Sequence, residues 1–350
     1  MFTKKFNHTF VIAEAGSNWK TKNRKSSIAR AKKMIITASK CGADAIKFQT
    51  YSENDVYVPN AGNSDYLKKS GITKSINEIF DEFSMPYDIL PILSNFCKKY
   101  NIHFMSTPFS IDDARAVNKF VKFHKIASYE INHLPLLKFL AKTKKPIIIS
   151  TGASNVNEID YALKKLRKFG AKNICILQCT ACYPAPTESL NLSSINFLKK
   201  KYNTSVGLSD HSTDIILAPI MAIGYGATII EKHFTLNKNF SGPDHAFALE
   251  PKELKNLVQH IREADLAKGS GIKDVLDVEK ELHKFAKRSI QATKNIKKGE
   301  EFQLGKNFDI LRPGKRKRGL EPRFISKIEG KNSSRKILSG NGITISDIDN

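Results

Sequence analysis

Eight short runs of β-branched and aliphatic residues recur along the chain, and each run ends in polar residues. The predicted strands are Phe10–Glu14, Ala45–Gln49, His103–Thr107, Lys125–Ser128, Pro146–Ser150, Ile174–Thr180, Ser205–Ser209 and Thr228–His233. Stretches with helical periodicity separate many of them, as at residues 26–41, 87–100, 157–170 and 213–225. Strands that alternate with helices pair in parallel through βαβ units. Eight units within about 280 residues favour a closed (β/α)8 TIM barrel. An open doubly wound sheet is the alternative, but no GxGxxG fingerprint follows the first strand.

The pattern of predicted secondary structure changes after the last helical runs, residues 251–269 and 277–289. From about Arg288 onward the chain consists of short β-like pieces separated by Gly, Asn and Pro. This change predicts two domains, a barrel domain at residues 1–285 and a small β-rich domain at residues 286–350.

The net charge is +23, from 57 basic and 34 acidic residues, and it raises the question of an anionic partner. The only tight basic run is Lys315–Arg318, and no aromatic residue interleaves it. A nucleic-acid-binding protein is therefore the weaker hypothesis, and solvated helix faces with an anionic substrate are the stronger one.

Hydrophobic residues make up 41% of the chain, yet no run of about 18 apolar residues is present, so we expect no membrane partner. The first residues lack the features of a signal peptide, which predicts a cytoplasmic protein. Cys179 and Cys182 form a lone CxxC, and we expect the five cysteines to be reduced.

Polar residues at the ends of all eight predicted strands indicate an active site, because barrel enzymes place their working groups there. A structural protein would gain little from groups that must all be desolvated. Three pairs of these residues lie two positions apart and so share a strand face: Lys47 with Gln49, Ser209 with His211, and Glu231 with His233.

His211 and His233 close two successive strands, and neighbouring strands lie about 4.8 Å apart. Two imidazoles at this spacing can share one divalent metal and leave positions open for water and substrate. Mn²⁺ suits such a site, with Mg²⁺ or Co²⁺ as alternatives. Two buried, hydrogen-bonded histidines are the competing interpretation.

Two lysines and several hydroxyl groups are expected at the same end of the barrel, where the strands end, and can bind a phosphate and a carboxylate there. They are Lys47, Lys125, Thr107, Ser128, Ser150 and Ser209. Three carboxylates, Glu14, Glu130 and Asp244, can bind sugar hydroxyls or move protons.

The motifs FVIAEAGSN, AIKFQT, STPFS, HKIASYE, IISTGAS, LQCTACYPAP, VGLSDHS and IEKHFT…GPDHAFALEP resemble the sialic acid synthase family. The tail RSIQATKNIKKGEEF…LRPG is similar to the antifreeze-like C-terminal domain of that family. The resemblance spans nearly the whole chain in the same order.

The resemblance implies a domain-swapped homodimer in which the antifreeze-like domain of one chain caps the barrel of the other. His211 and His233 would bind the metal. The hydroxyls and lysines named above would hold phosphoenolpyruvate. The residues implied to face the amino sugar are Glu14, Gln49, Glu130, Tyr183 and Asp244, with Arg312 reaching it from the partner chain.

The implied reaction joins C3 of phosphoenolpyruvate to the aldehyde of an open-chain amino sugar, after which water adds to C2 and phosphate leaves. N-acetylmannosamine, its 6-phosphate and diacetamido-trideoxy hexoses are all candidate acceptors. The stretch GPDHAFALEP favours neuraminate- or legionaminate-type members over pseudaminate-type ones. An aldolase is the alternative enzyme, although it would need a Schiff-base lysine or more metal ligands.

Two positions depart from the family pattern. Trp19 stands where many members have His, and Ala181 stands where some have Asn. The segment Gly62–Gly71 is expected to be a loop close to the substrate.

Overall fold

A computed structural model describes residues 7–63 and 73–349 of the chain. These residues form two compact units, Met1–Gly269 and Ser270–Asn350. The division after Gly269 comes before the boundary at residue 285 that the sequence predicts, so that the helix α12 (Lys280–Phe285) is part of the second unit.

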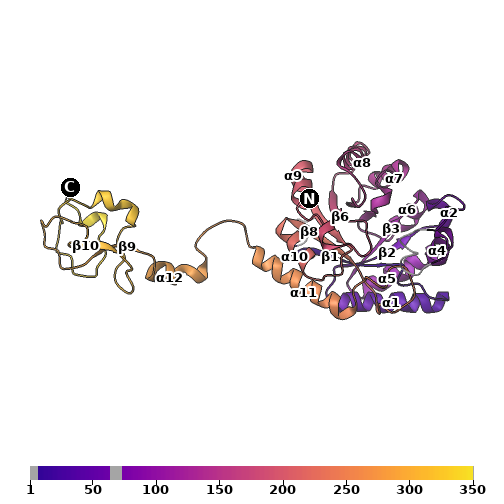
Figure 1. Ribbon diagram of the computed structural model, residues 1–350, viewed down its shortest axis with the longest axis horizontal. Helices are drawn as coiled ribbons and strands as arrows, with labels where there is room; N and C mark the ends of the chain where they lie inside the picture. Colours follow the sequence, from indigo (N-terminus) through magenta and orange to yellow (C-terminus); the bar gives the residue numbers. More distant parts are fainter. Residues whose placement is uncertain (1–6, 64–72, 350) are drawn as a thin grey trace. The chain divides into compact units, whose positions relative to one another are not determined.

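The first unit contains eight parallel strands in a nearly closed barrel, and this confirms the predicted fold class (Figure 1). The hydrogen-bonded order is β3-β2-β1-β8-β7-β6-β5-β4, and its two end strands, β3 and β4, lie in contact. The strands are β1 (Phe10–Gly16), β2 (Ala45–Thr50), β3 (His103–Pro108), β4 (His124–Ile126), β5 (Ile147–Ser150), β6 (Ile174–Cys179), β7 (Ser205–Asp210) and β8 (Ala227–His233).

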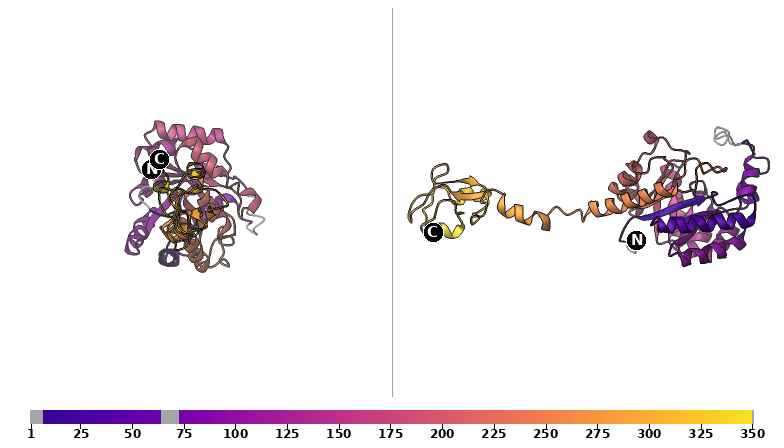
Figure 2. Two further views of the ribbon diagram at one scale, coloured as in Figure 1. Left: turned by 90° about the vertical axis from the view of Figure 1, so that its left-hand side faces the viewer. Right: turned by 90° about the horizontal axis from the view of Figure 1, so that it is seen from below.

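Helices surround these strands, as two directions of view show (Figures 1 and 2). They are α1 (Arg24–Lys40), α2 (Glu53–Val56), α4 (Ile76–Phe83), α5 (Leu90–Lys99), α6 (Ile111–Asn118), α7 (Leu134–Lys142), α8 (Val156–Lys168), α9 (Ser194–Tyr202), α10 (Leu217–Gly224) and α11 (Pro251–Lys268). Capping residues define where several begin: Asn155, for example, accepts from the backbone N–H of Glu158, whose side chain bonds back to Asn155. None of the described helices is long and apolar enough to cross a membrane.

The predicted strand Lys125–Ser128 is wrong at its C-terminal end. Strand β4 ends at Ile126, and Ser128 begins a short 3₁₀ helix, η3 (Ser128–Glu130). The backbone N–H of Glu130 bonds to the carbonyl of Ala127 and so turns the chain away from the sheet. Ser128 therefore approaches the mouth of the barrel from a turn.

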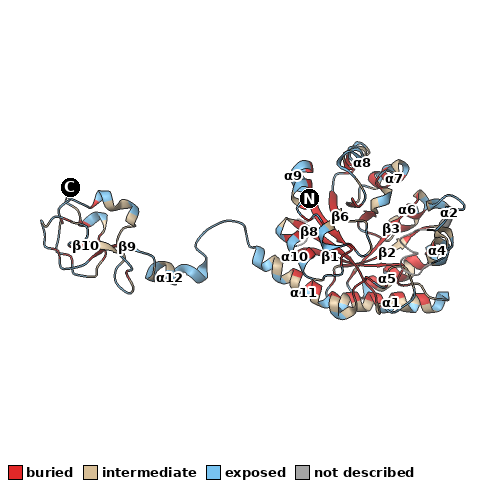
Figure 3. Ribbon diagram, in the orientation of Figure 1, coloured by how far each residue is buried: buried red, intermediate tan, exposed pale blue. Residues whose placement is uncertain are grey.

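Alternation along the strands sorts side chains between two buried regions. In Figure 3 the strands at the centre of this unit are coloured as buried. One face of each strand packs against the helices, as Val11 and Ile46 do. The other face fills the barrel with a small apolar cluster: Phe10, Ile12, Ala45, Met105, Phe123, Ile148, Cys175, Leu177 and Ile229. Charged residues follow two positions later on four of these strands: Glu14, Lys47, Lys125 and Glu231. The apolar cluster thus closes the barrel beneath a polar layer.

The interior of the barrel leaves no room for a side chain at Gly207. A Cβ atom there would lie 2.4 Å from the carbonyl oxygen of Ile229 and 2.6 Å from a methyl carbon of Leu177. The glycine lets strands β7 and β8 approach closely just below the polar layer.

The second unit has its own core around an antiparallel pair of strands, β9 (Ser289–Ala292) and β10 (Phe308–Leu311). Its buried residues are Ile290, Ala292, Ile296, Phe302, Phe308, Ile328, Ile337 and Ile343. Short 3₁₀ helices, η5 (Asp277–Glu279), η6 (Pro322–Lys327) and η7 (Ile345–Asp347), and isolated β-bridges complete it.

Candidate active site

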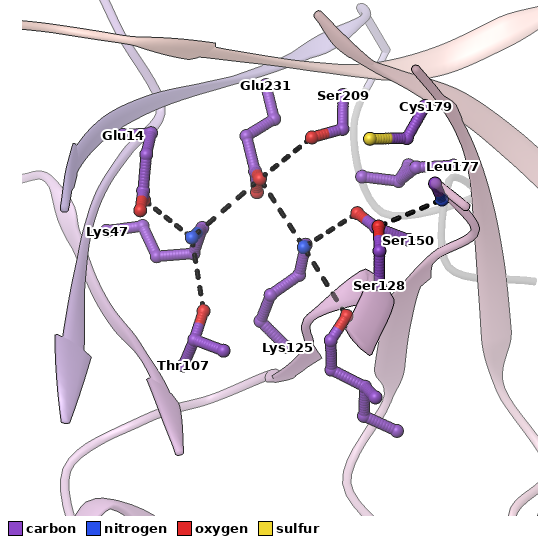
Figure 4. A network of polar contacts seen from close by, with 12 residues as sticks. Glu14, Lys47, Thr107, Lys125, Ser128, Ser150, Leu177, Cys179, Ser209 and Glu231 are labelled. Carbon is purple, nitrogen blue, oxygen red and sulfur yellow. Dashed lines mark hydrogen bonds and ion pairs between the residues drawn. The ribbon is translucent and has the colours of Figure 1, made fainter. Parts of the chain in front are cut away.

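A buried network of charged side chains lies inside the barrel, above its apolar cluster (Figure 4). Nζ of Lys47 lies 2.5 Å from Oε2 of Glu14 and 3.7 Å from Oε1 of Glu231. The same oxygen of Glu231 lies 3.4 Å from Nζ of Lys125. Glu231 therefore stands between the two lysines, and these four residues are each at most 5% exposed.

Hydroxyl groups complete the surroundings of both ammonium groups. Lys47 donates to Oγ1 of Thr107 at 3.1 Å, and Lys125 donates to Oγ of Ser150 at 2.7 Å. Ser209 donates to Oε1 of Glu231 at 3.2 Å. The structure therefore brings both predicted lysines together with three of the four predicted hydroxyls.

The fourth hydroxyl belongs to Ser128, which accepts a hydrogen bond of 2.9 Å from the backbone N–H of Gly152. A Cβ atom on Gly152 would lie 3.0 Å from Oγ of Ser128 and 2.9 Å from Sγ of Cys179. The loop after β5 is thus held tightly against Ser128, beside the Ser150 that contacts Lys125.

Burial and the neighbouring charges shift the pKa of each ionisable group in this network in opposite directions. Burial raises the pKa of Glu14 to about 7, although the charge of Lys47 opposes it. Burial acts the same way on Glu231, but Lys125 and Lys47 outweigh it and hold its pKa below the ordinary value. Glu231 is thus the permanent anion of the network, and Glu14 is the carboxyl group that can exchange a proton near neutral pH.

The two lysines also differ. Burial lowers the pKa of Lys125, and the charge of Glu231 offsets this only in part. For Lys47 burial is outweighed by Glu14 and Glu231, so that its pKa lies above the ordinary value. An incoming anion would strengthen the charged form of both lysines.

The imidazoles of His211 and His233 lie next to each other at the ends of β7 and β8, with ring centroids 5.5 Å apart. Nδ1 of His211 lies 2.8 Å from the carbonyl oxygen of Thr180 and donates to it, so that the neutral ring carries its lone pair on Nε2. Nδ1 of His233 is buried without a hydrogen-bond partner. Burial and then the neighbouring cations hold the pKa of His233 well below its ordinary range, so its ring is neutral.

These two rings fit an open metal site. Neutral imidazoles are metal ligands, and the hydrogen bond to Thr180 fixes one ring as a second partner does in known metal sites. Residues 7–63 and 73–349 hold no cluster of three or more His, Cys, Asp or Glu side chains that could bind a metal. Water and substrate would therefore have to complete the coordination of any ion.

Aromatic rings enclose the imidazole pair. Tyr183 lies 4.2 Å from the ring of His211 and 5.5 Å from the ring of Phe247 between centroids, and Phe247 lies 4.9 Å from His233. Phe247 is 8% exposed, so this side of the pair is shielded from water. Tyr183 was predicted for the site, whereas Phe247 was not.

A second cluster of oxygen atoms lies on the other side of Glu14. Gln49 donates to Oε1 of Glu14 at 3.0 Å, and Ser17 donates to Oδ2 of Asp244 at 3.0 Å. A β-bulge between Glu14 and Gly16 brings these groups close, because a Cβ atom on Gly16 would lie 2.8 Å from Oδ2 of Asp244 and 3.3 Å from Oε1 of Glu14. The predicted residues Glu14, Gln49 and Asp244 therefore form one wall of the site that is rich in hydrogen-bond acceptors.

Two predicted residues lie apart from the charged network. Glu130 is half-buried in η3, where burial and the charge of Asp113 raise its pKa to about 7. Its charge in turn raises the pKa of Tyr57, after the larger effect of burial. Arg312 is exposed and belongs to the second compact unit.

The sequence pointed to Glu231 as an inward strand-end residue but gave it no role, and in the structure it contacts both lysines and Ser209. Its spacing of two from His233 already placed it on the inner strand face, but nothing in the spacing showed that both lysines lie within reach. Of the two departures from the family pattern, Trp19 is fully buried, and Cβ of Ala181 would lie 3.1 Å from a Cβ atom on Gly152. Most of the predicted substrate loop at residues 62–71 lies outside the described residues.

Comparison with known proteins identifies relatives along nearly the whole chain. Residues 34–273 match the NeuB family. The N,N'-diacetyllegionaminic acid synthase of Campylobacter jejuni is 40% identical over 93% of this chain and 96% of its own. The spore coat polysaccharide biosynthesis protein SpsE of Bacillus subtilis is 39% identical over 97% of this chain and 93% of its own. The crystal structure of N-acetylneuraminic acid synthetase from Leptospira borgpetersenii in complex with citrate has a TM-score of 0.69 at 31% identity and covers 79% of this chain and 90% of that one.

Proposed function

We propose, from the premise that the chain belongs to the NeuB family, that it condenses phosphoenolpyruvate with the aldehyde of an amino sugar. The products are a nine-carbon 2-keto sugar acid and phosphate. The observation that carries the proposal is the buried Lys47–Glu231–Lys125 network beside two adjacent imidazoles.

Phosphoenolpyruvate is proposed to bind at the two lysines. Lys47 and Lys125 supply ammonium donors, and Thr107, Ser128, Ser150 and Ser209 supply hydroxyls. Charge-assisted hydrogen bonds of this kind suit phosphate and carboxylate oxygens. Because Glu231 already pairs with both lysines, the incoming anion would share them with a carboxylate that keeps them in place.

His211 and His233 are proposed to hold a divalent ion, Mn²⁺ first, with Mg²⁺ or Co²⁺ as alternatives. Such an ion would supply Lewis acidity at the aldehyde oxygen of the acceptor. The neutral ring of His233 and the fixed ring of His211 support this assignment.

In the reaction a bond forms between C3 of phosphoenolpyruvate and the aldehyde carbon, whose oxygen becomes a hydroxyl by gaining a proton that is balanced by the one the added water loses. C2 becomes electron-poor, and the oxygen of a water molecule adds to it. The bond from C2 to the phosphate oxygen then breaks, phosphate leaves, and C2 becomes the ketone. Lys47 and Lys125 offset the negative charge that develops on the departing phosphate.

Glu14 is proposed to position the water and receive its proton. The pKa of Glu14 is raised to about 7 by burial, with Lys47 opposing, and this suits proton transfer near neutral pH. Gln49 and Asp244 lie beside Glu14 and would bind hydroxyls of the acceptor sugar. Tyr183 would form the edge of the sugar-binding site near the imidazoles. Glu130 would contact a more distant part of the sugar.

An N-acetylmannosamine-type sugar is the proposed acceptor, so that the product resembles N-acetylneuraminate. A diacetamido-trideoxy hexose is the second candidate, giving a legionaminate- or pseudaminate-type product. The 40% identity to a diacetyllegionaminic acid synthase supports this second candidate.

We further propose a domain-swapped homodimer in which the second unit, with an antifreeze-like fold, caps the barrel of the partner chain. The chain on either side of the division at Gly269 supports an interface, because large apolar side chains are exposed there: Leu266, Ile272, Leu276, Val278 and Leu282. Arg312 is exposed and free to meet an anionic group of the bound substrates. The cytoplasm is the proposed location, and the five free thiols are what a reducing compartment favours.

The test is phosphate release from phosphoenolpyruvate with Mn²⁺ across a panel of amino sugars, after removal of bound metal with a chelator. Release should depend on one sugar and on added metal, and mass spectrometry should show a 2-keto acid with three more carbons than that sugar. Release without any sugar, or no release with every sugar from folded and metal-loaded protein, would contradict the proposal.

A further inference from the structure

A further buried ion pair joins Asp210 and Lys232, the residues that directly precede His211 and His233. Because side chains alternate along a strand, these two face away from the barrel interior. Nζ of Lys232 lies 2.5 Å from Oδ2 of Asp210, and their side chains are 2% and 0% exposed. Asp210 and Lys232 are also the last paired residues of strands β7 and β8. The ion pair therefore stands where the hydrogen-bonded ladder between these strands stops.

The pair touches the chain on both sides of His211. Besides Asp210, Nζ of Lys232 donates to the carbonyl oxygen of Ser212 at 2.7 Å and to its hydroxyl at 3.3 Å. Asp210 in turn accepts from the backbone N–H of Ser212 at 2.8 Å. Because Lys232 directly precedes His233, one ammonium group links the residue before His233 to the residues before and after His211.

This arrangement fixes His211 where the sheet no longer does. His211 lies one residue beyond the end of β7, so ladder hydrogen bonds to β8 do not hold its backbone. Its ring bonds to Thr180 and its carbonyl oxygen accepts from Ala185, and both contacts come from the β6 side. On the β8 side, hydrogen bonds from Lys232 hold Asp210 and Ser212, the two neighbours of His211.

Stability alone does not account for two buried charges at this place. Taking both charges out of water costs about as much as their attraction returns, and a well-packed apolar pair would often be as stable or more so. A lysine ammonium with three donors, in contrast, can fix three oxygen atoms in one geometry.

We propose that Lys232 is a positioning residue that sets the separation of the His211 and His233 imidazoles and thereby the affinity of the pair for a divalent cation. This inference rests on the metal site of the proposed function. Residues that orient metal ligands typically change metal affinity by about 10- to 100-fold when they are altered.

The experiment compares Mn²⁺ affinity with stability in the full chain. The variants are Lys232→Met and the double variant Asp210→Asn/Lys232→Met, which leaves no unpaired buried charge. The control is Arg262→Met, which removes an ion pair of 2.8 Å with Asp44 near the start of β2. Free Mn²⁺ is measured by electron paramagnetic resonance, and the melting temperature is measured on metal-free protein.

We expect Lys232→Met and Arg262→Met to lower the melting temperature and the double variant to change it less than Lys232→Met does. Only the two variants that change Lys232 should weaken Mn²⁺ binding, by about tenfold or more. An unchanged Mn²⁺ affinity in the double variant, with wild-type protein binding the ion, would overturn the positioning role and leave the proposed function intact. Wild-type protein that binds no Mn²⁺ would instead remove the metal site itself, and this inference with it.

Discussion

Oε1 of Glu231 lies 3.4 Å from Nζ of Lys125, and both side chains are almost completely buried. The same oxygen accepts from Ser209 and lies 3.7 Å from Nζ of Lys47. One carboxylate on β8 thus lies between the ammonium groups of two lysines, one from β2 and one from β4 (Figure 4).

Replacing Glu231 by Gln should therefore damage both folding and turnover. The change leaves two buried ammonium groups with one counter-charge fewer, and breaking a buried pair in this way costs about 3 kcal/mol or more of stability. We expect kcat/KM for phosphate release to fall by about 100-fold or more, since such a group acts on the charge distribution of the reacting atoms.

The matched control for this prediction is Glu263→Gln, which removes an exposed carboxylate on α11. It should leave both the melting temperature and kcat/KM near their wild-type values. A Glu231→Gln protein with wild-type kinetics would mean that the network is structural only.

Gly16→Ala should disturb the wall formed by Glu14 and Asp244. Gly16 has a φ of +47°, and a Cβ atom would lie 2.8 Å from Oδ2 of Asp244. The left-handed backbone alone costs an alanine about 1 kcal/mol, and the contact forces the Asp244 carboxylate to move. We expect lower stability and a KM for the amino sugar raised by about tenfold, which corresponds to roughly 1.4 kcal/mol.

Gly305→Ala separates the two effects, because Gly305 has a φ of +73° with no atom within 4 Å of a Cβ. This variant should lose stability from the backbone alone and keep the KM for the sugar. If Gly16→Ala behaved in the same way, Asp244 would not contact the acceptor.

Glu130 should make stability depend on pH. Burial, aided by the charge of Asp113, raises its pKa to about 7 in the folded protein, compared with an ordinary value of about 4.3. The folded state therefore binds the proton more tightly than the unfolded state. The stabilisation is fully present below about pH 4.3 and is lost as the pH rises through 7.

The comparison is with Glu130→Gln, which cannot ionise. Between pH 5 and pH 8 the wild type should lose about 1 to 2 kcal/mol of unfolding free energy more than the variant does, a figure reduced for the solvent access of a half-buried group. Denaturant unfolding of both proteins at the two pH values measures the difference. Parallel pH dependence in the two proteins would show that Glu130 is not perturbed.

The domain-swapped dimer predicts that two inactive variants rescue each other. A Lys47→Met chain has a defective barrel and an intact Arg312, whereas an Arg312→Ala chain has the reverse. After unfolding and refolding together, mixed dimers would contain one complete site, so the mixture should regain about a quarter of wild-type activity. Phosphate release measures the recovery.

Refolding each variant alone is the control and should give no recovery. If the mixture stayed as inactive as the separate variants while mixed dimers formed, Arg312 would act on the barrel of its own chain. An Arg312→Ala protein that is active by itself would mean that Arg312 has no role in turnover.

The sequence by itself determined the strand count, the order of strands and helices, and the inner faces of the strands. These follow from local periodicity, because the spacing of apolar residues, every second residue in a strand and about every 3.6 residues in a helix, can be read from a short stretch of sequence. Polar strand ends such as Lys47 and His233 could be assigned to one site for the same reason. The end of β4 could not, because the turn at Ala127 has no local marker strong enough to stop a β-rich run.

Only the tertiary structure decided which of the inward residues contact one another. Ser209 and Glu231 are register partners, and Glu231 meets lysines from strands that lie far away in the sequence. The pairing of Asp210 with Lys232 and the separation of Glu130 from the charged network also depend on register and on turns. Contacts across strands are set by how buried surfaces pack and which charges can share one dry interior, and those are properties of the whole barrel rather than of any segment.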